Sequence, residues 1–435
     1  MKNWMKLLPI GVVEAWLIFT LLVFEFGPYE YPPINHIKLF LYLIISNIFI
    51  LIGYIKGIRR APNVTASKPI GFSFFSFSCY FAVIWSIVMI STWPSLQQIM
   101  IGYLSGATDT LRAQQLSNIG GRWQDYYNIL LSPMVYVVIT IGPYSWFKLK
   151  KLHKILVIFV ILIKIFNAVM GGGRIEFLEV LFMSGGAASI PILSNRFKPP
   201  KIAIAIVVFG LFSTFTAYNI FIVASRSTMT SERYVGSQLT RDSSWLKQDG
   251  IIINHLPPSI QPAILQSLEY LSHGYYPLGL CLEKPVSGVT FGLGHSQFLI
   301  RNAEQVFQTR YFSEISYWNR LQMEDNYSVQ LFMSGYIWIA NDVTFLGSIF
   351  VLYGFAYLLG CTWIDSLTYI NYFSVTAFCF LMFMFFSLPM FSILLDGVPF
   401  VSFYSTLLLW GLGRSVVSRR SKLKSITSQR VSVFQ

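Results

Sequence analysis

Two arginines near the ends of apolar stretches are the residues of this sequence best suited to chemistry. Arg174 follows three glycines at 171–173 and opens an apolar stretch, and Arg226 directly follows another such stretch. A guanidinium group is permanently charged and presents a planar fork of donors that matches phosphate oxygens. Glycine lets other groups approach the backbone closely. The spacing therefore predicts that Arg174 and Arg226 bind the phosphate groups of a lipid.

The same chemistry extends to Arg233 and Arg241, which follow Arg226 in a polar stretch. Simpler interpretations stay open for all of these residues. Arg174 could extend toward ordinary lipid headgroups, as long cationic side chains do at a membrane surface. Arg233 and Arg241 could be solvated charges of a loop.

An aromatic segment contains the candidate proton acceptor. His273 lies between Tyr270 and the pair Tyr275 and Tyr276, and an imidazole can accept a proton near neutral pH. A lone histidine in a loop is often structural, and the tyrosines could equally belong to an interfacial belt. Asp342 stands at the entry of a later apolar stretch, where it could orient an arginine or accept a proton.

Several common kinds of site have no sequence signature here. The chain contains no Walker loop, dinucleotide fingerprint, HExxH, CxxC or Asp-x-Asp pattern. We therefore expect no metal and no cofactor, and we expect any chemistry to depend on arginines. Three of the four cysteines lie in apolar runs, so no disulfide framework is expected.

The composition indicates the environment in which these residues work. The chain has 435 residues, of which 54% are hydrophobic and 12% charged, whereas a soluble chain carries about 25% charged residues. A single buried core stops growing at about 250–300 residues, so a larger apolar interior does not explain the excess. These values exclude an ordinary soluble enzyme, a disordered chain and a disulfide scaffold. They predict a multi-span membrane protein.

Apolar runs of about 17–25 residues are candidate transmembrane helices. Ten such runs predict an all-α polytopic protein, with spans at 8–26, 38–55, 70–91, 128–147, 153–170, 175–193, 202–224, 337–361, 369–393 and 399–413. The chain then divides into four parts: an N-terminal bundle of about seven spans at 1–224, a large loop at 225–336, a C-terminal group of about three spans at 337–413, and a basic tail at 414–435.

The distribution of positive charge predicts the orientation. The net charge is +13, and cytoplasmic loops concentrate lysine and arginine. If the N-terminus lies in the cytoplasm, most Lys and Arg residues outside the loop at 225–336 lie there as well. Both termini are then cytoplasmic, and the loop at 225–336 lies outside. We therefore attribute the positive charge to topology rather than to nucleic-acid binding. Within the loop, apolar residues at helical spacing predict an amphipathic helix at 258–272.

Charged residues inside the predicted spans need partners, because a charge at mid-bilayer costs about 2.5–3.5 kcal/mol on insertion scales. Lys164 and Glu179 lie at similar depth on either side of the turn at 171–173. We predict that they pair. The small residues at 184–189 (SGGAAS) predict a face for close helix packing.

Three local patterns resemble the bacterial O-antigen or oligosaccharide repeat-unit polymerases of the Wzy type. The first is Gly-Gly-Arg at 172–174 with Gly185, an Arg-x10-Gly spacing. The second is the segment at 270–280 (YLSHGYYPLGL), and the third is Ile-Ala-Asn-Asp at 339–342. The many spans and one dominant late loop also resemble this family. One departure is that no second Arg-x10-Gly follows Arg226.

The resemblance implies a GT-C-like glycosyltransferase of the bacterial inner membrane with a large helical periplasmic loop. Such an enzyme transfers a growing glycan from undecaprenyl diphosphate to the nonreducing end of a new lipid-linked repeat unit. Arg174 and Arg226 would neutralise the leaving diphosphate and His273 would act as the base. The substrate-binding candidates are Arg233, Arg241, Tyr270, Tyr275, Tyr276 and Asp342. The partners implied are lipid-linked oligosaccharides, the bilayer and a chain-length regulator in the membrane.

Alternative functions remain open at this point. An O-antigen ligase would share the layout and the donor but would transfer the glycan to lipid A-core. A flippase for lipid-linked oligosaccharides would be a transporter, and transporters of that kind are commonly built from repeated halves, which this sequence does not show. A non-catalytic assembly scaffold or sensor is the fourth possibility.

Overall fold

The computed structural model describes most of the chain as helix. The described residues are 3–60, 71–91, 123–170, 174–202, 205, 209–210, 213–214, 216–220, 245–247, 255–257, 260–325, 327, 333–368 and 371–433. The predicted all-α membrane architecture is confirmed, because these residues are nearly all helical and several of the helices are apolar over long stretches.

Seven helices are long and apolar enough to cross a membrane. They are α1 (Asn3–Phe26), α2 (His36–Arg59), α3 (Phe72–Ser91), α6 (Trp123–Tyr144), α7 (Lys151–Met170), α8 (Arg174–Leu193) and α17 (Gly335–Thr368). Each coincides with one of the ten predicted spans. Their outward faces carry large apolar side chains such as Ile44 and Ile158, which suits contact with lipid rather than water.

The other three predicted spans have different outcomes. The one at 369–393 appears as a shorter apolar helix of 15 residues, α18 (Phe373–Ser387). The one at 399–413 is the first part of α19 (Gly397–Val433), which continues into the basic tail. The one at 202–224 lies mostly outside the described residues. The total of ten spans therefore stays a prediction.

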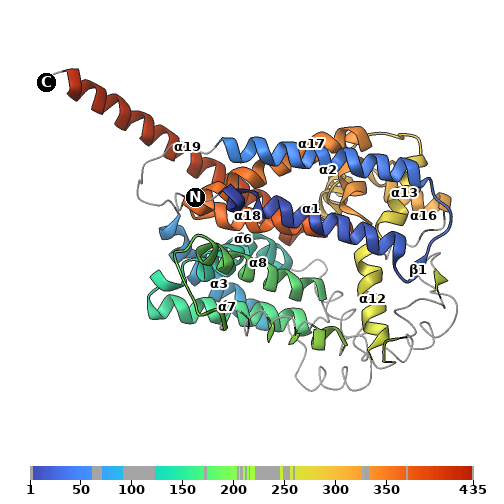
Figure 1. Cartoon of the computed structure of the whole chain (residues 1–435), viewed down its shortest axis with the longest axis horizontal. Helices are drawn as coiled ribbons and strands as arrows, with labels where there is room; N and C mark the ends of the chain where they lie inside the picture. The colour runs from blue at the N-terminus through green and yellow to red at the C-terminus, as the bar shows by residue number, and fades with distance from the viewer. Residues whose placement is uncertain are drawn as a thin grey trace.

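The two ends of the helical bundle carry different parts of the chain. Figure 1 shows the N- and C-termini at one end, and at the other end the helices α12 (Gln261–Ser272), α13 (Tyr275–Glu283) and α16 (Tyr317–Asp325). The predicted amphipathic helix at 258–272 is thus confirmed as α12. The same segment holds α14 (Gln297–Phe307) and α15 (Tyr311–Glu314), and β1 (Tyr29–Glu30) pairs antiparallel with β2 (Trp245–Leu246). A short 3-10 turn, η1 (Trp146–Lys148), joins α6 to α7.

Helices α2 and α17 pack with their backbones in direct contact. A Cβ atom at Gly53 would collide with the carbonyl of Tyr353, and one at Gly57 would collide with the carbonyl of Tyr357. From the other side, a Cβ at Gly360 would lie 2.6 Å from the carbonyl oxygen of Tyr54. Because only glycine lacks a Cβ, these positions allow the two backbones to touch.

The predicted packing face at 184–189 behaves differently. A Cβ at Gly185 would meet no atom within 4 Å, and one at Gly186 would meet only the Cys379 sulfur, 3.8 Å away. Ala187 is fully buried, so part of the segment does pack closely. The two glycines, however, leave space beside α8 instead of bringing a second backbone into contact with it.

Helix α17 is interrupted near its start. Thr344 has φ 65° and ψ 171°, so two helical pieces meet there at a kink. A β-branched residue at positive φ is strained by about 1–3 kcal/mol, and such strain is kept only where the surroundings hold it in place. Asp342, two residues earlier, accepts hydrogen bonds from a neighbouring loop, which ties the end of the first piece to that loop.

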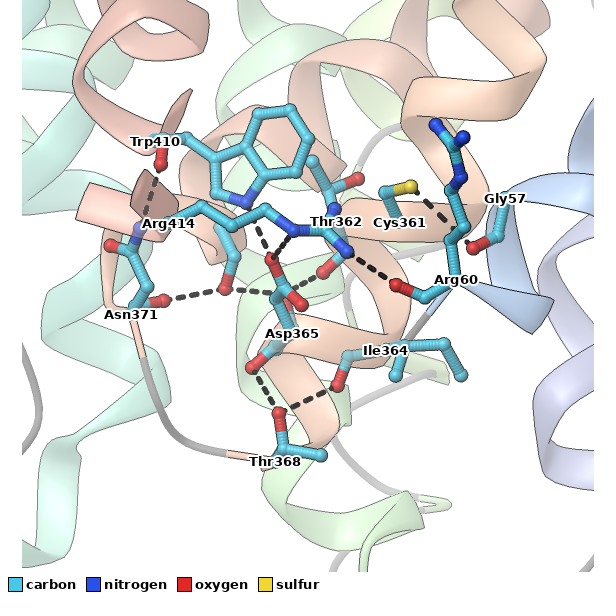
Figure 2. A network of polar contacts seen from close by, with 12 residues as sticks. Gly57, Arg60, Cys361, Thr362, Ile364, Asp365, Thr368, Asn371, Trp410 and Arg414 are labelled. Atoms are coloured by element: carbon cyan, nitrogen blue, oxygen red, sulfur yellow. Dashed lines mark hydrogen bonds and ion pairs between the residues drawn. The ribbon is translucent and has the colours of Figure 1, made fainter. Parts of the chain in front are cut away.

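A buried polar network joins α2, α17 and α19 near the termini (Figure 2). Asp365 accepts a hydrogen bond from Trp410 Nε1 at 2.9 Å, and its Oδ2 lies 3.7 Å from Nε of Arg414. Arg414 also donates to the backbone carbonyl of Arg60 at 2.7 Å. The guanidinium therefore connects the end of α2 to a carboxylate of α17 that is 2% exposed.

Candidate functional site

A cavity of about 650 Å³ lies between the spanning helices and the segment that precedes α19. This volume lies in the range of small-molecule binding sites. Its lining includes apolar, aromatic, amide and charged side chains. The polar and aromatic members of the lining are Trp85, Asn128, Tyr136, Lys164, Asn167, Glu176, Glu179, Gln297, Trp338, Phe383, Phe391, Ser392 and Asp396.

The predicted pair of intramembrane charges forms part of the wall. Lys164 Nζ lies 3.7 Å from Glu179 Oε2, which confirms the prediction. The Tyr136 hydroxyl donates to Glu179 at 2.5 Å, and Lys164 donates to the same hydroxyl at 3.2 Å. Lys164 also lies over the Tyr136 ring, 4.4 Å from its centroid. Three spans, α6, α7 and α8, thus share one polar cluster that faces the cavity.

Arg174 lies in the first turn of α8, directly before two residues that line this cavity. Its Nη1 donates to Gln266 Oε1 at 2.9 Å, and its Nη2 donates to the Tyr270 hydroxyl at 3.0 Å. The guanidinium also stacks over the Tyr270 ring at 4.6 Å. The next two residues, Ile175 and Glu176, line the cavity. Helix α12 therefore holds the Arg174 guanidinium in a fixed position, next in sequence to two residues of the cavity lining.

Two tryptophans supply aromatic faces and indole donors to the same space. Trp85 Nε1 donates to Asn128 Oδ1 at 2.7 Å. Trp338 is 4% exposed, and its buried Nε1 has no hydrogen-bond partner within the described part of the chain. A buried donor without a partner costs about 1–3 kcal/mol. The Trp338 indole therefore marks a place where a polar ligand could accept a hydrogen bond.

Behind the cavity wall, Asp342 organises the loop that leads into α14. Its carboxylate accepts hydrogen bonds from Thr290 Oγ1 at 2.6 Å, from Gly292 N at 2.9 Å, from Gly294 N at 2.6 Å and from the backbone N of His295 at 3.1 Å. A Cβ at Gly294 would collide with Thr290 Oγ1. The loop can therefore wrap around the carboxylate only with glycine at that position.

Asp342 also contacts the ring of His295. Its Oδ2 lies 2.7 Å from Nδ1, and Nε2 of the same ring lies 2.9 Å from the Tyr404 hydroxyl. From the sequence alone, Asp342 could orient an arginine or accept a proton. Among the described residues, the side chain that it orients is this histidine, two residues before Gln297, which lines the cavity.

His273, the predicted base, is not among the described residues that line the cavity. Its side chain is 2% exposed, and Nε2 lies 2.6 Å from the Tyr327 hydroxyl. The ring also packs against Tyr31, with the centroids 6.0 Å apart. These contacts place His273 in the interior of the segment that carries α12 and α13. Its role as a base stays a prediction.

The three tyrosines near His273 have separate positions. Tyr270 holds Arg174, as described above. Tyr275 is 1% exposed and its hydroxyl lies 2.9 Å from Thr20 Oγ1 of α1. Tyr276 stacks on Tyr31 with centroids 5.5 Å apart. Tyr275 and Tyr276 thus pack the loop segment onto the bundle, and neither lines the described cavity.

Three predicted arginines cannot be placed beside this site. Arg226, Arg233 and Arg241, as well as the glycines at 171–173, lie outside the described residues. The predicted proximity of Arg174 and Arg226 therefore stays a prediction.

Sequence reasoning missed several residues that line the cavity, notably Trp338, Asn128, Gln297 and Asp396. Trp338 lies one turn before Asp342 on α17, so the pattern at 339–342 lies on the helix that carries it. Asp396 lies in a polar interruption between two apolar stretches, which is a usable signal. Asn128 and Gln297 had no local signal, because a single amide in a long sequence is common.

Comparisons of this chain with models of protein families, with curated proteins and with solved structures give no match.

Proposed function

We propose that the chain is a membrane glycosyltransferase that polymerises undecaprenyl-diphosphate-linked oligosaccharide repeat units, as the sequence resemblance implies. The observation that carries the proposal is the position of Arg174. Its guanidinium is fixed by Gln266 and Tyr270, and the two residues that follow it, Ile175 and Glu176, line a cavity of about 650 Å³. A cation held in place before the reaction stabilises charge that develops on a leaving group without a cost of reorganisation.

The first turn of α8 adds to the attraction for a diphosphate. Arg174 is the first residue of this helix, and the N-terminal end of a helix carries partial positive charge and unpaired N–H groups. Arg174 and the helix end therefore act on an anion from the same side. In this proposal the diphosphate of the donor lipid binds at Arg174, and its sugar enters the cavity.

The cavity lining suits carbohydrate. Trp85 and Trp338 offer flat apolar faces, while Asn128, Gln297 and Asp396 offer hydrogen-bonding groups for hydroxyls. Mostly apolar walls with a few placed polar groups are usual for small-ligand sites, where the polar groups set orientation and specificity.

Two carboxylates of the cavity, Glu176 and Asp396, are better placed than His273 to serve as the base. In the reaction, an acceptor hydroxyl oxygen forms a bond to the anomeric carbon of the donor glycan. The bond from that carbon to the diphosphate oxygen breaks, and its electron pair leaves on the diphosphate beside Arg174. The hydroxyl proton passes to the carboxylate, which must lie within hydrogen-bond distance of that oxygen.

The test measures glycan polymer ladders in cells that carry Arg174→Lys, with Arg310→Lys as the matched control. Lysine keeps the charge but loses the planar fork, so we expect Arg174→Lys to shorten or abolish the ladder, with activity reduced at least about tenfold. Arg310 is exposed in the loop segment at the same end of the molecule, and we expect its variant to give a normal ladder. A normal ladder from both variants, at equal protein levels, would contradict the proposal.

A second experiment separates the other functions. Purified protein in vesicles is given lipid-linked repeat units without lipid A-core. Elongated lipid-linked products support polymerisation. A requirement for lipid A-core would identify a ligase instead. Movement of the lipid across the bilayer without elongation would identify a flippase. If the protein neither elongates nor moves the lipid, a non-catalytic scaffold or sensor is the function that is left.

A further inference from the structure

A second, smaller hollow lies farther along α8, between this helix, α1, α17 and α18. Its volume is about 150 Å³. Its lining is almost wholly apolar, and the residues that form it are Leu8, Pro9, Val12, Phe182, Gly186, Ser189, Leu193, Trp363, Phe378, Cys379 and Met382. We refer to it as the α8 groove.

The α8 groove and the large cavity lie on one face of α8. The helix lines the cavity with Ile175 and Glu179 and the groove with Phe182, Gly186, Ser189 and Leu193. These positions follow one another at intervals of three or four residues, so they form a single stripe along the helix. At a rise of 1.5 Å per residue, the stripe is about 27 Å long, close to the thickness of the hydrocarbon core of a bilayer.

The absence of a side chain at Gly186 leaves the space that forms the groove on α8. Gly186 has room for a Cβ, because the nearest atom would be the Cys379 sulfur at 3.8 Å. A larger side chain there would extend into the space between α8 and α18. Gly185, next to it, does not line the groove, although a Cβ there would also meet no atom within 4 Å.

A cluster of aromatic rings stands between the cavity and the groove. The Phe182 ring of the groove lies 5.3 Å from that of Phe383, which lines the cavity, and 5.0 Å from that of Phe386. The polar part and the apolar part of the stripe therefore meet at Phe182. A molecule that occupies both parts needs a polar head and one slender apolar chain.

We propose that the α8 groove binds the isoprenoid chain of the lipid whose diphosphate lies at Arg174. This inference rests on the proposed function. Arg174 begins α8, so a head bound there leaves the chain to run down the same helix face toward Leu193. The groove is bounded by four helices, α1, α8, α17 and α18, and suits one chain rather than the two chains of a phospholipid. Its aromatic and sulfur-containing side chains, Phe182, Trp363, Phe378, Cys379 and Met382, are polarisable and pack well against an unsaturated chain.

The test uses the full-length protein in vesicles and an undecaprenyl diphosphate that carries a photoreactive diazirine in its chain. We expect cross-links on α1, α8 and α18 at groove residues such as Val12, Ser189 and Met382. Gly186→Leu should reduce this labelling at least about fivefold, because a leucine fills the groove, while the neighbouring variant Gly185→Leu should leave it unchanged.

Two further measurements separate the failure of this inference from that of the proposed function. Farnesyl diphosphate has the same head but a short chain, and its binding should depend on Arg174 and should survive Gly186→Leu. If farnesyl diphosphate binds but the long chain labels other helices, or labels Gly186→Leu as strongly as the wild type, the groove is not the chain site. If neither lipid binds in an Arg174-dependent way, the proposed function fails as well. Equal labelling of the groove by a diazirine phosphatidylcholine would overturn the assignment to an isoprenoid chain.

Discussion

Lys164 Nζ lies 3.7 Å from Glu179 Oε2, and this ion pair joins α7 to α8 in the wall of the large cavity. Both side chains are mostly shielded, with 13% and 11% of their surfaces exposed. The Tyr136 hydroxyl contacts both of them. Such a pair holds two spans in register only while both charges are present, because either one alone would be left uncompensated in an apolar environment.

We therefore predict that charge reversal at one position destabilises the protein and that reversal at both restores it. Lys164→Glu and Glu179→Lys should each lower the free energy of unfolding by about 3–5 kcal/mol. The double variant should recover most of this loss. Thermal unfolding of purified protein in detergent, together with the yield of monodisperse protein, measures the effect. Single variants as stable as the wild type would show that the pair contributes nothing to the fold.

The contacts of Asp342 predict a graded series of effects on the loop at 290–295. Asp342→Asn removes the charge that His295 and three backbone N–H groups share, and we expect a loss of about 1–3 kcal/mol. Tyr404→Phe removes only the hydroxyl that contacts the far side of the His295 ring, and we expect a smaller loss of stability. Hydrogen exchange of the loop amides measures both variants. Equal protection in Asp342→Asn and the wild type would contradict the prediction.

The network of Figure 2 predicts strong coupling between α17 and α19. Arg414→Ala leaves the buried Asp365 carboxylate without its cation, and we expect this to cost about 3–5 kcal/mol. The same change should cost much less in an Asp365→Asn background. Arg59→Ala is the control, since Arg59 is an exposed arginine near the same end. Equal costs of Arg414→Ala in both backgrounds would show that the two residues are not coupled.

An ion-pair cluster that joins the end of α13 to α16 predicts a dependence on pH. Lys284 lies 2.7 Å from Glu324 Oε2 and 2.6 Å from Asp325 Oδ2, and Arg320 donates to Glu324 at 3.0 Å. The hydrogen bonds from Lys284 and then Arg320 hold the pKa of Glu324 below its ordinary value of 4.5. Burial lowers the pKa of Lys284, but its hydrogen bonds with Asp325 and Glu324 outweigh burial and raise this pKa.

The sign of the effect follows from these directions. Because the pKa of Glu324 is lowered on folding, its contribution to stability is present above its unfolded pKa and is lost as the pH falls through the folded value. The Lys284 contribution is lost only as the pH rises through its raised pKa, above its ordinary value of 10.5. We expect a small difference in Tm between wild type and Glu324→Gln near pH 7 that begins to shrink near pH 4, about the unfolded pKa, and vanishes only below the lowered pKa of Glu324. A difference that persists there would exclude Glu324 as its source.

The sequence was sufficient to predict the features that depend on hydropathy and helix geometry. Seven of the predicted spans coincide with long apolar helices, because a run of about twenty apolar residues is typical of a membrane-spanning helix and rare elsewhere. The Lys164–Glu179 pair was predictable because both residues lie a similar number of residues from one turn. The helix α12 was predictable from its periodic apolar residues.

The site was less predictable, because its residues come from segments that are distant in the sequence. Gln297, Trp338 and Asp396 meet at one cavity only after α14, α17 and the start of α19 are packed. The tyrosines Tyr275 and Tyr276 follow a histidine and suggest a ligand surface, but they are buried against α1 and Tyr31. An aromatic residue in a loop looks the same in a sequence whether it contacts a ligand or packs the loop onto the bundle.

The glycine contacts between α2 and α17 have a mechanical consequence. Carbonyl groups contact the glycine backbones at Gly53, Gly57 and Gly360. Even a small sliding of α2 along α17 would bring main-chain atoms into collision, so we expect these two helices to move as one rigid unit. Helix α2 contributes no residue to the described lining of the cavity, whereas α7 and α8 contribute several. We therefore expect that any movement that opens the cavity occurs at α7 and α8, while α2 and α17 stay fixed relative to each other.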